Sequence, residues 1–260
     1  MIFEKSSKYL GLFTLLLSWM LPMSAQAVLF DFSDWDRTLK EHVRPSSLHG
    51  IRLSGFNYAA LKKSPQHFSA VLTRLEQFDP KELRNRDDKL AFWINVYNIG
   101  AIKLALDHEG INSLNEIGPN KGAVWKMRSL RVGGNSYSLD EVENKILRKF
   151  SEPRIHFAIV CASVSCPDLR AESYQPKKLA QQLDKQTRAF LSNDKKGLRI
   201  DSANKKLVVT KIFEWFAADF GGKTGIKSFL ARYTRGSAAS KQWNDYSLAY
   251  FDYDWSLNRI

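Results

Sequence analysis

Apolar residues at helical spacing predict the first two helices of the chain. Over residues 67–78 they recur every three or four positions, which is the pattern of a helix with one buried face. Between about Asn85 and His108 they cover most of the helix circumference, so we expect a long helix in the centre of the fold. Residues 85–87 offer candidates to cap the start of this helix, and Gly110 suits its end.

Further helices are predicted downstream. Ser138 and Glu141 have the spacing of a capping box, in which each side chain bonds to the other residue's backbone. We therefore expect a helix from Ser138 to about Phe150. Three more are expected, one beginning at Pro176 and two short ones over residues 212–220 and 226–233.

Short apolar segments beside turn residues predict strands. We expect two hairpins and two single strands. The second single strand, at the C-terminus, is rich in aromatic residues and is expected to pack back on the body of the domain. These segments are 124–138 around a Gly-Gly-Asn turn, 198–200 with 207–209, 155–160 and 246–258. Residues 28–65 are mixed and turn-rich. Because strands and helices do not alternate as repeated βαβ units, we predict the α+β class.

The N-terminus has the three parts of a secretory signal peptide. Lys5 and Lys8 precede the apolar stretch Leu10–Met23, and small residues stand at Ala25 and Ala27. A membrane span needs about 20 apolar residues, and this stretch is shorter. We expect cleavage after Ala27, a periplasmic or secreted mature chain of one domain over residues 28–260, and no transmembrane segment in it.

The mature chain is strongly basic. The full sequence has 39 Lys and Arg against 27 Asp and Glu, and removal of residues 1–27 leaves 37 against 26, a net charge of +11. Such a surplus favours an acidic partner or an envelope polymer, while export argues against nucleic acid as the partner. Solubility alone is the alternative explanation.

Asn95 and Asn98 lie inside the predicted central helix, where most neighbours are apolar. A buried amide must form hydrogen bonds or it costs about 1–3 kcal/mol. One explanation is that these amides tie the helix to the backbone of a loop or strand. The other is that one of them lines a site, where it orients a base or holds an oxyanion.

The segment from His156 to Cys166 combines side chains that can carry chemistry. His156 is embedded in the predicted strand, and the strand leads into a loop that contains both cysteines of the chain, Cys161 and Cys166. A loop with thiols and hydroxyls suits a nucleophile. In an exported protein, however, two cysteines are expected to form a disulfide. Side chains five apart on a regular strand point to opposite faces, so Cys161 meets His156 only if the strand ends or twists.

Other kinds of site have weaker support. Glu143, on the helix begun at Ser138, is a candidate acid, base or orienter of a histidine, or else a solvated surface residue. His156, Cys161 and Cys166 do not have the spacing of a usual zinc site. The chain has no Walker loop, Gly-rich dinucleotide fingerprint, Gly-x-Ser-x-Gly or His-Glu-x-x-His. We expect neither a metal nor another cofactor.

Four motifs, in the same order, resemble the family called domain of unknown function 547. They are LAFWINVYN at residues 90–98, SLDEVENKILR at 138–148, PRIHFAIVCASVSCP at 153–167 and YDWSLN at 253–258. The resemblance covers a core of about residues 83–193 and the C-terminal extension. It implies a shared fold and a cluster of functional positions: Asn95, Asn98, Glu143, Arg154, His156, Cys161 and Cys166. Members often have His where this chain has Asn144, and Asn or a small residue where it has Val160.

Two functions follow from these observations. The first is an exported thiol-dependent hydrolase or transferase for peptide, amide or ester bonds, on a fold like papain or transglutaminase. Cys161 would be its nucleophile, His156 its base, and Glu143 or Asn98 the orienter, with Asn95, Arg154 and Cys166 in support. The second is a non-catalytic exported binding module, in which Cys161 and Cys166 form a structural disulfide and the basic, aromatic-rich surface holds an acidic partner or an envelope polymer.

Overall fold

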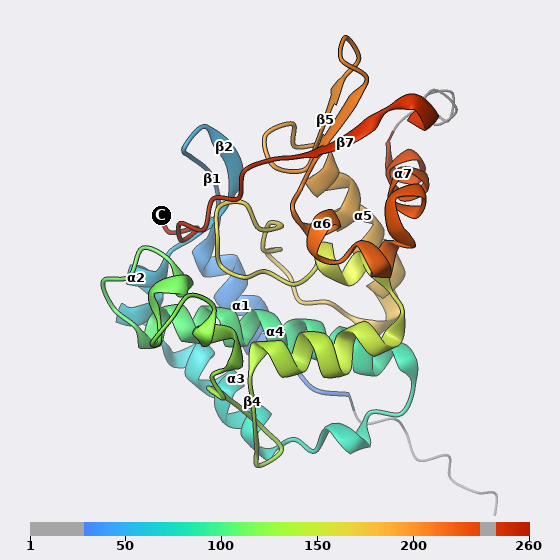
Figure 1. Ribbon diagram of the computed structural model, residues 1–260. Coiled ribbons are helices and arrows are strands. Elements are labelled where there is room, and N and C mark those ends of the chain that lie inside the picture. The colour runs from blue at the N-terminus through green and yellow to red at the C-terminus, as the bar shows by residue number, and fades with distance from the viewer. Residues whose placement is uncertain (1–28, 235–242) are drawn as a thin grey trace, which may run out of the picture.

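The computed structural model describes residues 29–234 and 243–260. The predicted signal peptide, residues 1–27, lies outside the described residues. The described chain has helices and three small sheets, which confirms the α+β class (Figure 1). None of the helices in these two stretches is long and apolar enough to cross a membrane.

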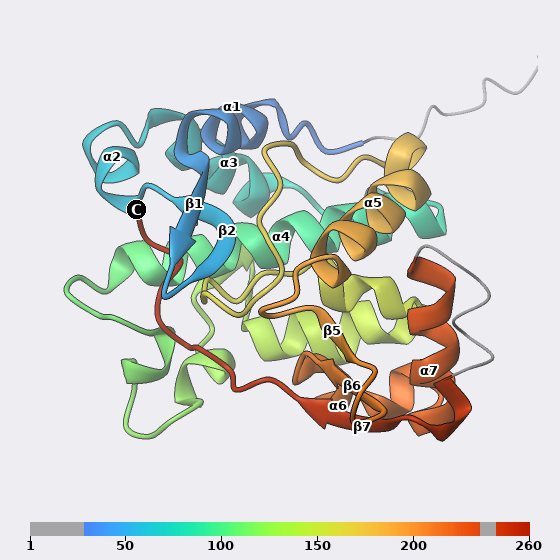
Figure 2. The same ribbon diagram turned by 90° about the horizontal axis from the view of Figure 1, so that it is seen from above.

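The predicted central helix is α4 (Arg86–Asp107), and it runs through the middle of the molecule (Figure 2). The Asn85 side chain caps it by accepting a hydrogen bond of 2.9 Å from the backbone N–H of Asp88. Every residue from Leu90 to Ile102 is buried. The amphipathic helix is α3 (Gln66–Gln77), as predicted, and it buries Phe68, Val71 and Leu75.

The N-terminal part is more regular than its sequence indicated. It forms α1 (Ser33–His42), an antiparallel hairpin of β1 (Val43–Leu48) and β2 (Ile51–Phe56), and α2 (Tyr58–Lys63). These elements contain few apolar residues each, so the periodicity was too weak to assign them. They are held by packing of a few large side chains, such as Trp35 and Phe56, on the main core.

The segment after α4 leads to the functional region. The predicted first hairpin is shorter than expected, with β3 (Leu130–Val132) and β4 (Asn135–Tyr137), and a 3-10 turn η3 (Ala123–Lys126) precedes it. Gly133 and Gly134 both have positive φ, 56° and 75°, which the two-residue turn requires. The capping box is confirmed, since Ser138 Oγ accepts from Glu141 N at 3.1 Å and Glu141 Oε2 from Ser138 N at 3.1 Å.

The helix that follows is not α-helical throughout. It begins as the π-helical η4 (Glu141–Ile146) and continues as the 3-10 helix η5 (Leu147–Phe150). Both segments pack against α4, beside which they run (Figures 1 and 2). A π-helical turn inserts an extra residue into the helical path and often marks a functional site.

The predicted strand over residues 155–160 is wrong. The chain there forms the 3-10 helix η6 (Pro153–Phe157) and then an irregular segment. All six residues are buried, and a short run that is buried on every side has no periodicity to separate strand from helix. Pro153 at the first position suits the start of a helical turn.

The C-terminal half contains a second hydrophobic cluster. Its members come from α5 (Leu179–Leu191), which follows η7 (Pro176–Lys178), from the strands and helices after it, and from η6, which contributes Phe157. The predicted hairpin is β5 (Leu198–Asp201) with β6 (Lys206–Val209), and β7 (Ser247–Tyr250) adds to β6 in parallel. The two predicted short helices are α6 (Ile212–Trp215) with η8 (Ala217–Phe220), and α7 (Gly222–Tyr233).

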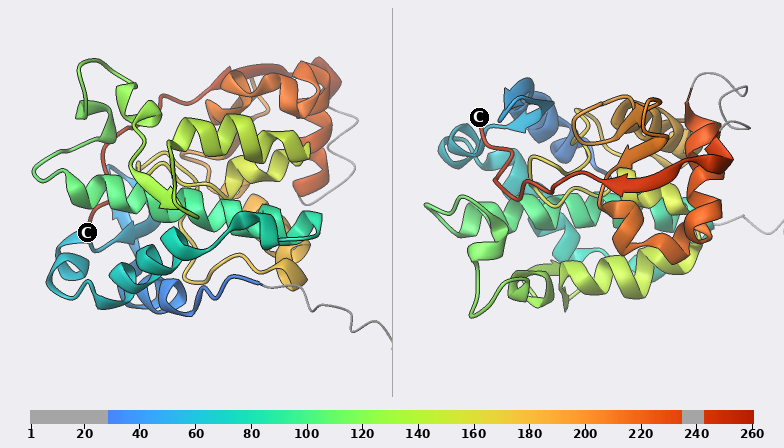
Figure 3. Two further views of the ribbon diagram at one scale, coloured as in Figure 1. Left: turned by 90° about the horizontal axis from the view of Figure 1, so that it is seen from below. Right: turned by 45° about the horizontal axis from the view of Figure 1, so that its top comes forward.

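After β7 the chain runs back across the molecule to the β1–β2 hairpin, as Figure 3 shows. Along this path Val164 N donates to Ser256 O at 2.8 Å and Asn258 N to Ala162 O at 3.0 Å. Phe56 N donates to Asn258 O at 2.7 Å. The C-terminal segment thus bonds to the loop at residues 162–164 and to β2, and within it only Ser247–Tyr250 is a strand, where the sequence predicted one over 246–258.

Candidate functional site

A cleft of about 220 Å³ opens where α4, η4, η6, α6 and the C-terminal segment meet. Its walls combine aromatic, acidic and sulfur-containing side chains, and none of the lysines and arginines of residues 29–234 and 243–260 is among them. The lining residues that matter below are Tyr97, Asp140, Glu143, Asn144, His156, Cys161, Cys166, Trp125, Trp215, Phe216, Tyr253 and Trp255.

Glu143 is the carboxyl group of this cleft with the strongest electrostatic perturbation. Its side chain is 15% exposed, and Tyr97 donates a hydrogen bond to Oε2 at 3.3 Å. Burial raises the pKa of Glu143 to about 7, because a carboxylate loses its hydration there. Near neutral pH the group therefore exists in both protonation states and can give up or take a proton.

His156 is anchored through one ring nitrogen. Its Nε2 lies 2.8 Å from Oδ2 of Asp219, and Asp219 also accepts from Arg148 Nε at 2.6 Å and Nη2 at 2.7 Å. The hydrogen bonds from Arg148 lower the pKa of Asp219, which is thus an ionised acceptor. Nε2 must then carry the proton, and Nδ1 presents a lone pair.

The other side of the imidazole is less constrained. Nδ1 lies 3.9 Å from Oε1 of Glu143, which is too long for a hydrogen bond. Phe216 stacks on the ring at 4.1 Å between centroids. Burial lowers the pKa of His156, so the ring is neutral at neutral pH.

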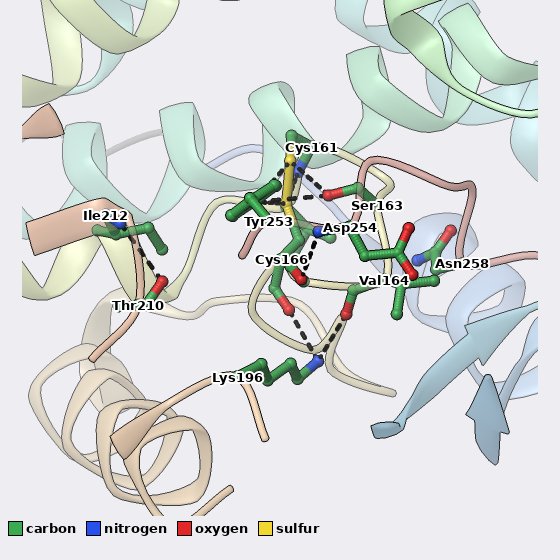
Figure 4. The surroundings of a disulfide bond; sticks show 12 residues. Cys161, Ser163, Val164, Cys166, Lys196, Thr210, Ile212, Tyr253, Asp254 and Asn258 are labelled. Atoms are coloured by element: carbon green, nitrogen blue, oxygen red, sulfur yellow. Dashed lines mark hydrogen bonds between the residues drawn. A yellow bond between two sulfur atoms is a disulfide. The ribbon is translucent and has the colours of Figure 1, made fainter. Parts of the chain in front are cut away.

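Cys161 and Cys166 are joined in a disulfide (Figure 4). The Tyr253 hydroxyl lies 3.3 Å from Sγ of Cys161 and 3.2 Å from Sγ of Cys166, and the Ser163 hydroxyl donates to it at 3.4 Å. Cys161 is partly exposed, whereas Cys166 is buried. Neither sulfur is a thiolate in this structure, so Cys161 cannot act as the predicted nucleophile while the bond is intact.

Lys196 holds the disulfide loop from below (Figure 4). Its ammonium group donates to the carbonyl oxygens of Cys166 at 2.8 Å and Val164 at 3.3 Å, and it pairs with Asp168 at 2.7 Å. A buried ammonium without such partners would cost several kcal/mol. Nothing in the local sequence indicated this role, since Lys196 lies 30 residues after Cys166.

Four aromatic side chains form a continuous layer along the cleft. Trp215 stacks on Trp255 with centroids 5.6 Å apart and an angle of 26° between the rings. Tyr253 contacts both rings, at 4.8 Å and 4.5 Å, and Trp125 lies 6.2 Å from Trp255. Trp215 is 45% exposed, so one part of this layer is open to solvent.

The two asparagines of α4 serve the fold. Asn95 exchanges two hydrogen bonds of 2.9 Å with the backbone of Tyr174, and Asn98 accepts from Val160 N at 2.8 Å and donates to Ala158 O at 3.1 Å. This confirms the first explanation for them. Neither lines the cleft, so Asn98 does not orient His156 there.

Arg154 also lies outside the cleft wall. Its guanidinium pairs with Glu152 at 2.5 Å and with Asp184 at 2.8 Å. It therefore links η6 to α5. Of the predicted site residues, the structure brings together Glu143, His156, Cys161 and Cys166.

Several residues of the site were not found from the sequence. Asp219 was not singled out because it is 63 residues from His156, and the aromatic layer joins residues of three distant segments. Asn144 lines the cleft, but its amide is already engaged: it donates to Asp140 Oδ1 at 3.0 Å and accepts from Arg148 Nη1 at 2.8 Å. In residues 29–234 and 243–260 no group of three or more His, Cys, Asp or Glu side chains is arranged to hold a metal ion.

Comparison with known proteins adds one match. A family model described as "Protein of unknown function, DUF547" matches residues 80–191. No curated protein and no solved structure matches the chain, so the expected likeness to papain or transglutaminase stays a prediction.

Proposed function

This chain belongs to the DUF547 family through residues 80–191, and from that premise we propose that it is an exported binding module whose cleft holds a ligand without covalent chemistry. The observation that carries the proposal is the Cys161–Cys166 disulfide in the cleft wall. Acyl transfer by a cysteine needs a thiolate, and a sulfur bonded to another sulfur has none.

The surroundings of the disulfide support a structural role for it. Tyr253 contacts both sulfurs, and Lys196 holds the carbonyl oxygen of Cys166. The C-terminal segment bonds to the same loop, with Ser165 N donating to Asp254 O at 3.1 Å. The bond therefore fixes one wall of the cleft, and the N-terminal sequence of the chain supports export to a compartment in which the bond persists.

A thiol-dependent hydrolase is the second candidate, and one feature of the cleft favours it. His156 is anchored at Nε2 by Asp219, and its Nδ1 carries the lone pair that a general base needs. Reduction of the disulfide would free Cys161 in the same cleft. The substrate would then be a peptide, amide or ester.

A thiol count on the mature protein, purified from its own export compartment, separates the two functions. Native and denatured samples are alkylated and weighed by mass spectrometry, and activity on thioester and peptide probes is measured with and without a dithiol reductant. We expect no alkylation of the native or the denatured sample, and no turnover with or without the reductant. Reductant-dependent turnover that is lost in Cys161→Ser but kept in Cys166→Ser would replace the binding module by the hydrolase.

A further inference from the structure

We propose that the cleft binds a compact organic cation, an alkylammonium or quaternary ammonium group, against the aromatic layer of Trp125, Trp215, Tyr253 and Trp255. This inference rests on the proposed binding function and names its ligand class.

The charges that line the cleft favour a cation. Asp140 and Glu143 contribute carboxyl groups, while no lysine or arginine side chain of the described part of the chain lines the cleft. This is unusual for a chain with 39 Lys and Arg. The Arg148 guanidinium lies behind the wall and is occupied by its bidentate pair with Asp219. An anion would therefore meet carboxylates without a compensating cation.

The aromatic layer offers the other half of such a site. The face of an indole ring attracts a cation within about 6 Å of its centroid, and the attraction grows when the cation is desolvated. Trp215 and Trp255 stack on each other, and Trp215 stays 45% exposed at the edge of the cleft. A quaternary ammonium group needs only such faces and one opposite charge, because it donates no strong hydrogen bond.

The polar groups of the cleft argue against a sugar, which needs several free hydrogen-bonding partners. Asn144 is engaged by Asp140 and Arg148, and the Tyr253 hydroxyl faces the two sulfurs. At His156, Nε2 is engaged by Asp219. Glu143 keeps one carboxyl oxygen, Oε1, without a hydrogen bond shorter than 3.5 Å in the part of the chain that is described.

Cation binding should be coupled to a proton at Glu143. Burial raises the pKa of this carboxyl to about 7 although the charge of Arg148 acts in the opposite direction, and a bound cation would lower that pKa and release the proton. The affinity is then expected to rise between pH 6 and pH 8. The titratable and charged groups that face Glu143 are Tyr97, Asp140, Arg148, His156, Asp219 and Tyr253.

The test uses the mature, oxidised protein and follows tryptophan fluorescence and binding heat at pH 8. Choline is compared with 3,3-dimethyl-1-butanol, its uncharged isostere, and with N-acetylglucosamine. We expect saturable binding of choline, at least 10-fold tighter than of the isostere. Equal binding of the two, no binding of choline, or tighter binding of the sugar would overturn the proposal.

Matched variants locate the site. Trp215→Leu is expected to weaken choline binding about 10-fold, Trp215→Phe to restore part of it, and Ile200→Ala, at an exposed position outside the cleft, to change nothing. Glu143→Gln should remove the rise in affinity between pH 6 and pH 8. If choline binds but Ile200→Ala weakens it as much as Trp215→Leu does, the cleft is not the site and the assignment fails.

Two further arms separate the possible outcomes. Free choline and phosphatidylcholine vesicles distinguish a soluble cation from a lipid headgroup, which share the same chemistry. Choline binding by a protein with free, reactive thiols would keep the cation site and end the proposed non-catalytic role. An intact disulfide without choline binding would end the cation site and keep the proposed non-catalytic role.

Discussion

The imidazole Nε2 of His156 lies 2.8 Å from Oδ2 of Asp219, and the same carboxylate receives two hydrogen bonds from Arg148. This contact joins η6 of the family core to η8 of the C-terminal half. It orients a neutral histidine with its Nδ1 lone pair toward Glu143. The Asp219 carboxylate thus links the C-terminal half to His156 and Arg148 through charged hydrogen bonds.

Removal of this carboxylate is expected to loosen the connection. Asp219→Asn leaves Arg148 without its charged partner, and we expect a loss of about 1–2 kcal/mol in the free energy of unfolding. Urea unfolding at pH 7 measures it. Asp252→Asn is the control, because Asp252 is exposed, and it should change stability by less than about 0.5 kcal/mol. Equal effects of the two variants would contradict this role of Asp219.

The disulfide closes a short loop, so its contribution to stability should be moderate. For a loop of this size the chain-entropy relation gives about 2 kcal/mol. We expect the double variant Cys161→Ser, Cys166→Ser to lose that amount in urea unfolding, and a dithiol reductant to lower the wild-type value similarly. A reductant effect that persists in the double variant would show that the disulfide is not its cause.

The two asparagines of α4 should be far more important for stability than for binding. Asn98→Ala would leave the buried Val160 N–H and Ala158 carbonyl without partners, which we expect to cost about 2–3 kcal/mol. Gln77→Ala, at an exposed position of α3, is the control with little expected change. Binding of choline by the folded Asn98→Ala protein should stay within about twofold of the wild type, because the residue does not line the cleft.

Glu143 should give the protein a characteristic dependence of stability on pH. Its folded pKa of about 7 is above the ordinary value of 4.5 for a glutamate, so the folded state binds the proton more tightly than the unfolded state. The stabilisation by this proton is complete below about pH 4.5 and is lost as the pH rises to about 7. We expect its total to be about 3 kcal/mol.

Glu143→Gln isolates this contribution, because the amide does not titrate. The difference in unfolding free energy between the variant and the wild type should grow in favour of the variant from pH 4.5 to pH 7. His156, whose pKa is lowered by burial, changes stability in the opposite direction on acidification, but it is present in both proteins. A difference that is constant over this range would show that Glu143 is ionised throughout.

The elements that depend on local periodicity and capping could be predicted from the amino-acid sequence. The apolar circumference of α4, the face of α3, the capping box at Ser138 and Glu141, and the turn at Gly133 and Gly134 each follow from interactions within a few residues. The family motifs likewise pointed to Glu143, His156 and the cysteines, which the structure gathers around one cleft.

The way in which these residues are used depends on long-range packing, which the sequence pattern does not reveal. The residues 155–160 are buried on every side, so their sequence carried no period that could distinguish a helical turn from a strand. Asp219, Lys196 and the aromatic layer reach the site from segments far along the chain, and their positions depend on how α5, α6 and the C-terminal segment pack. Sulfurs five residues apart can be bonded or free, and the fold of the loop between Tyr253 and Lys196 brings them together.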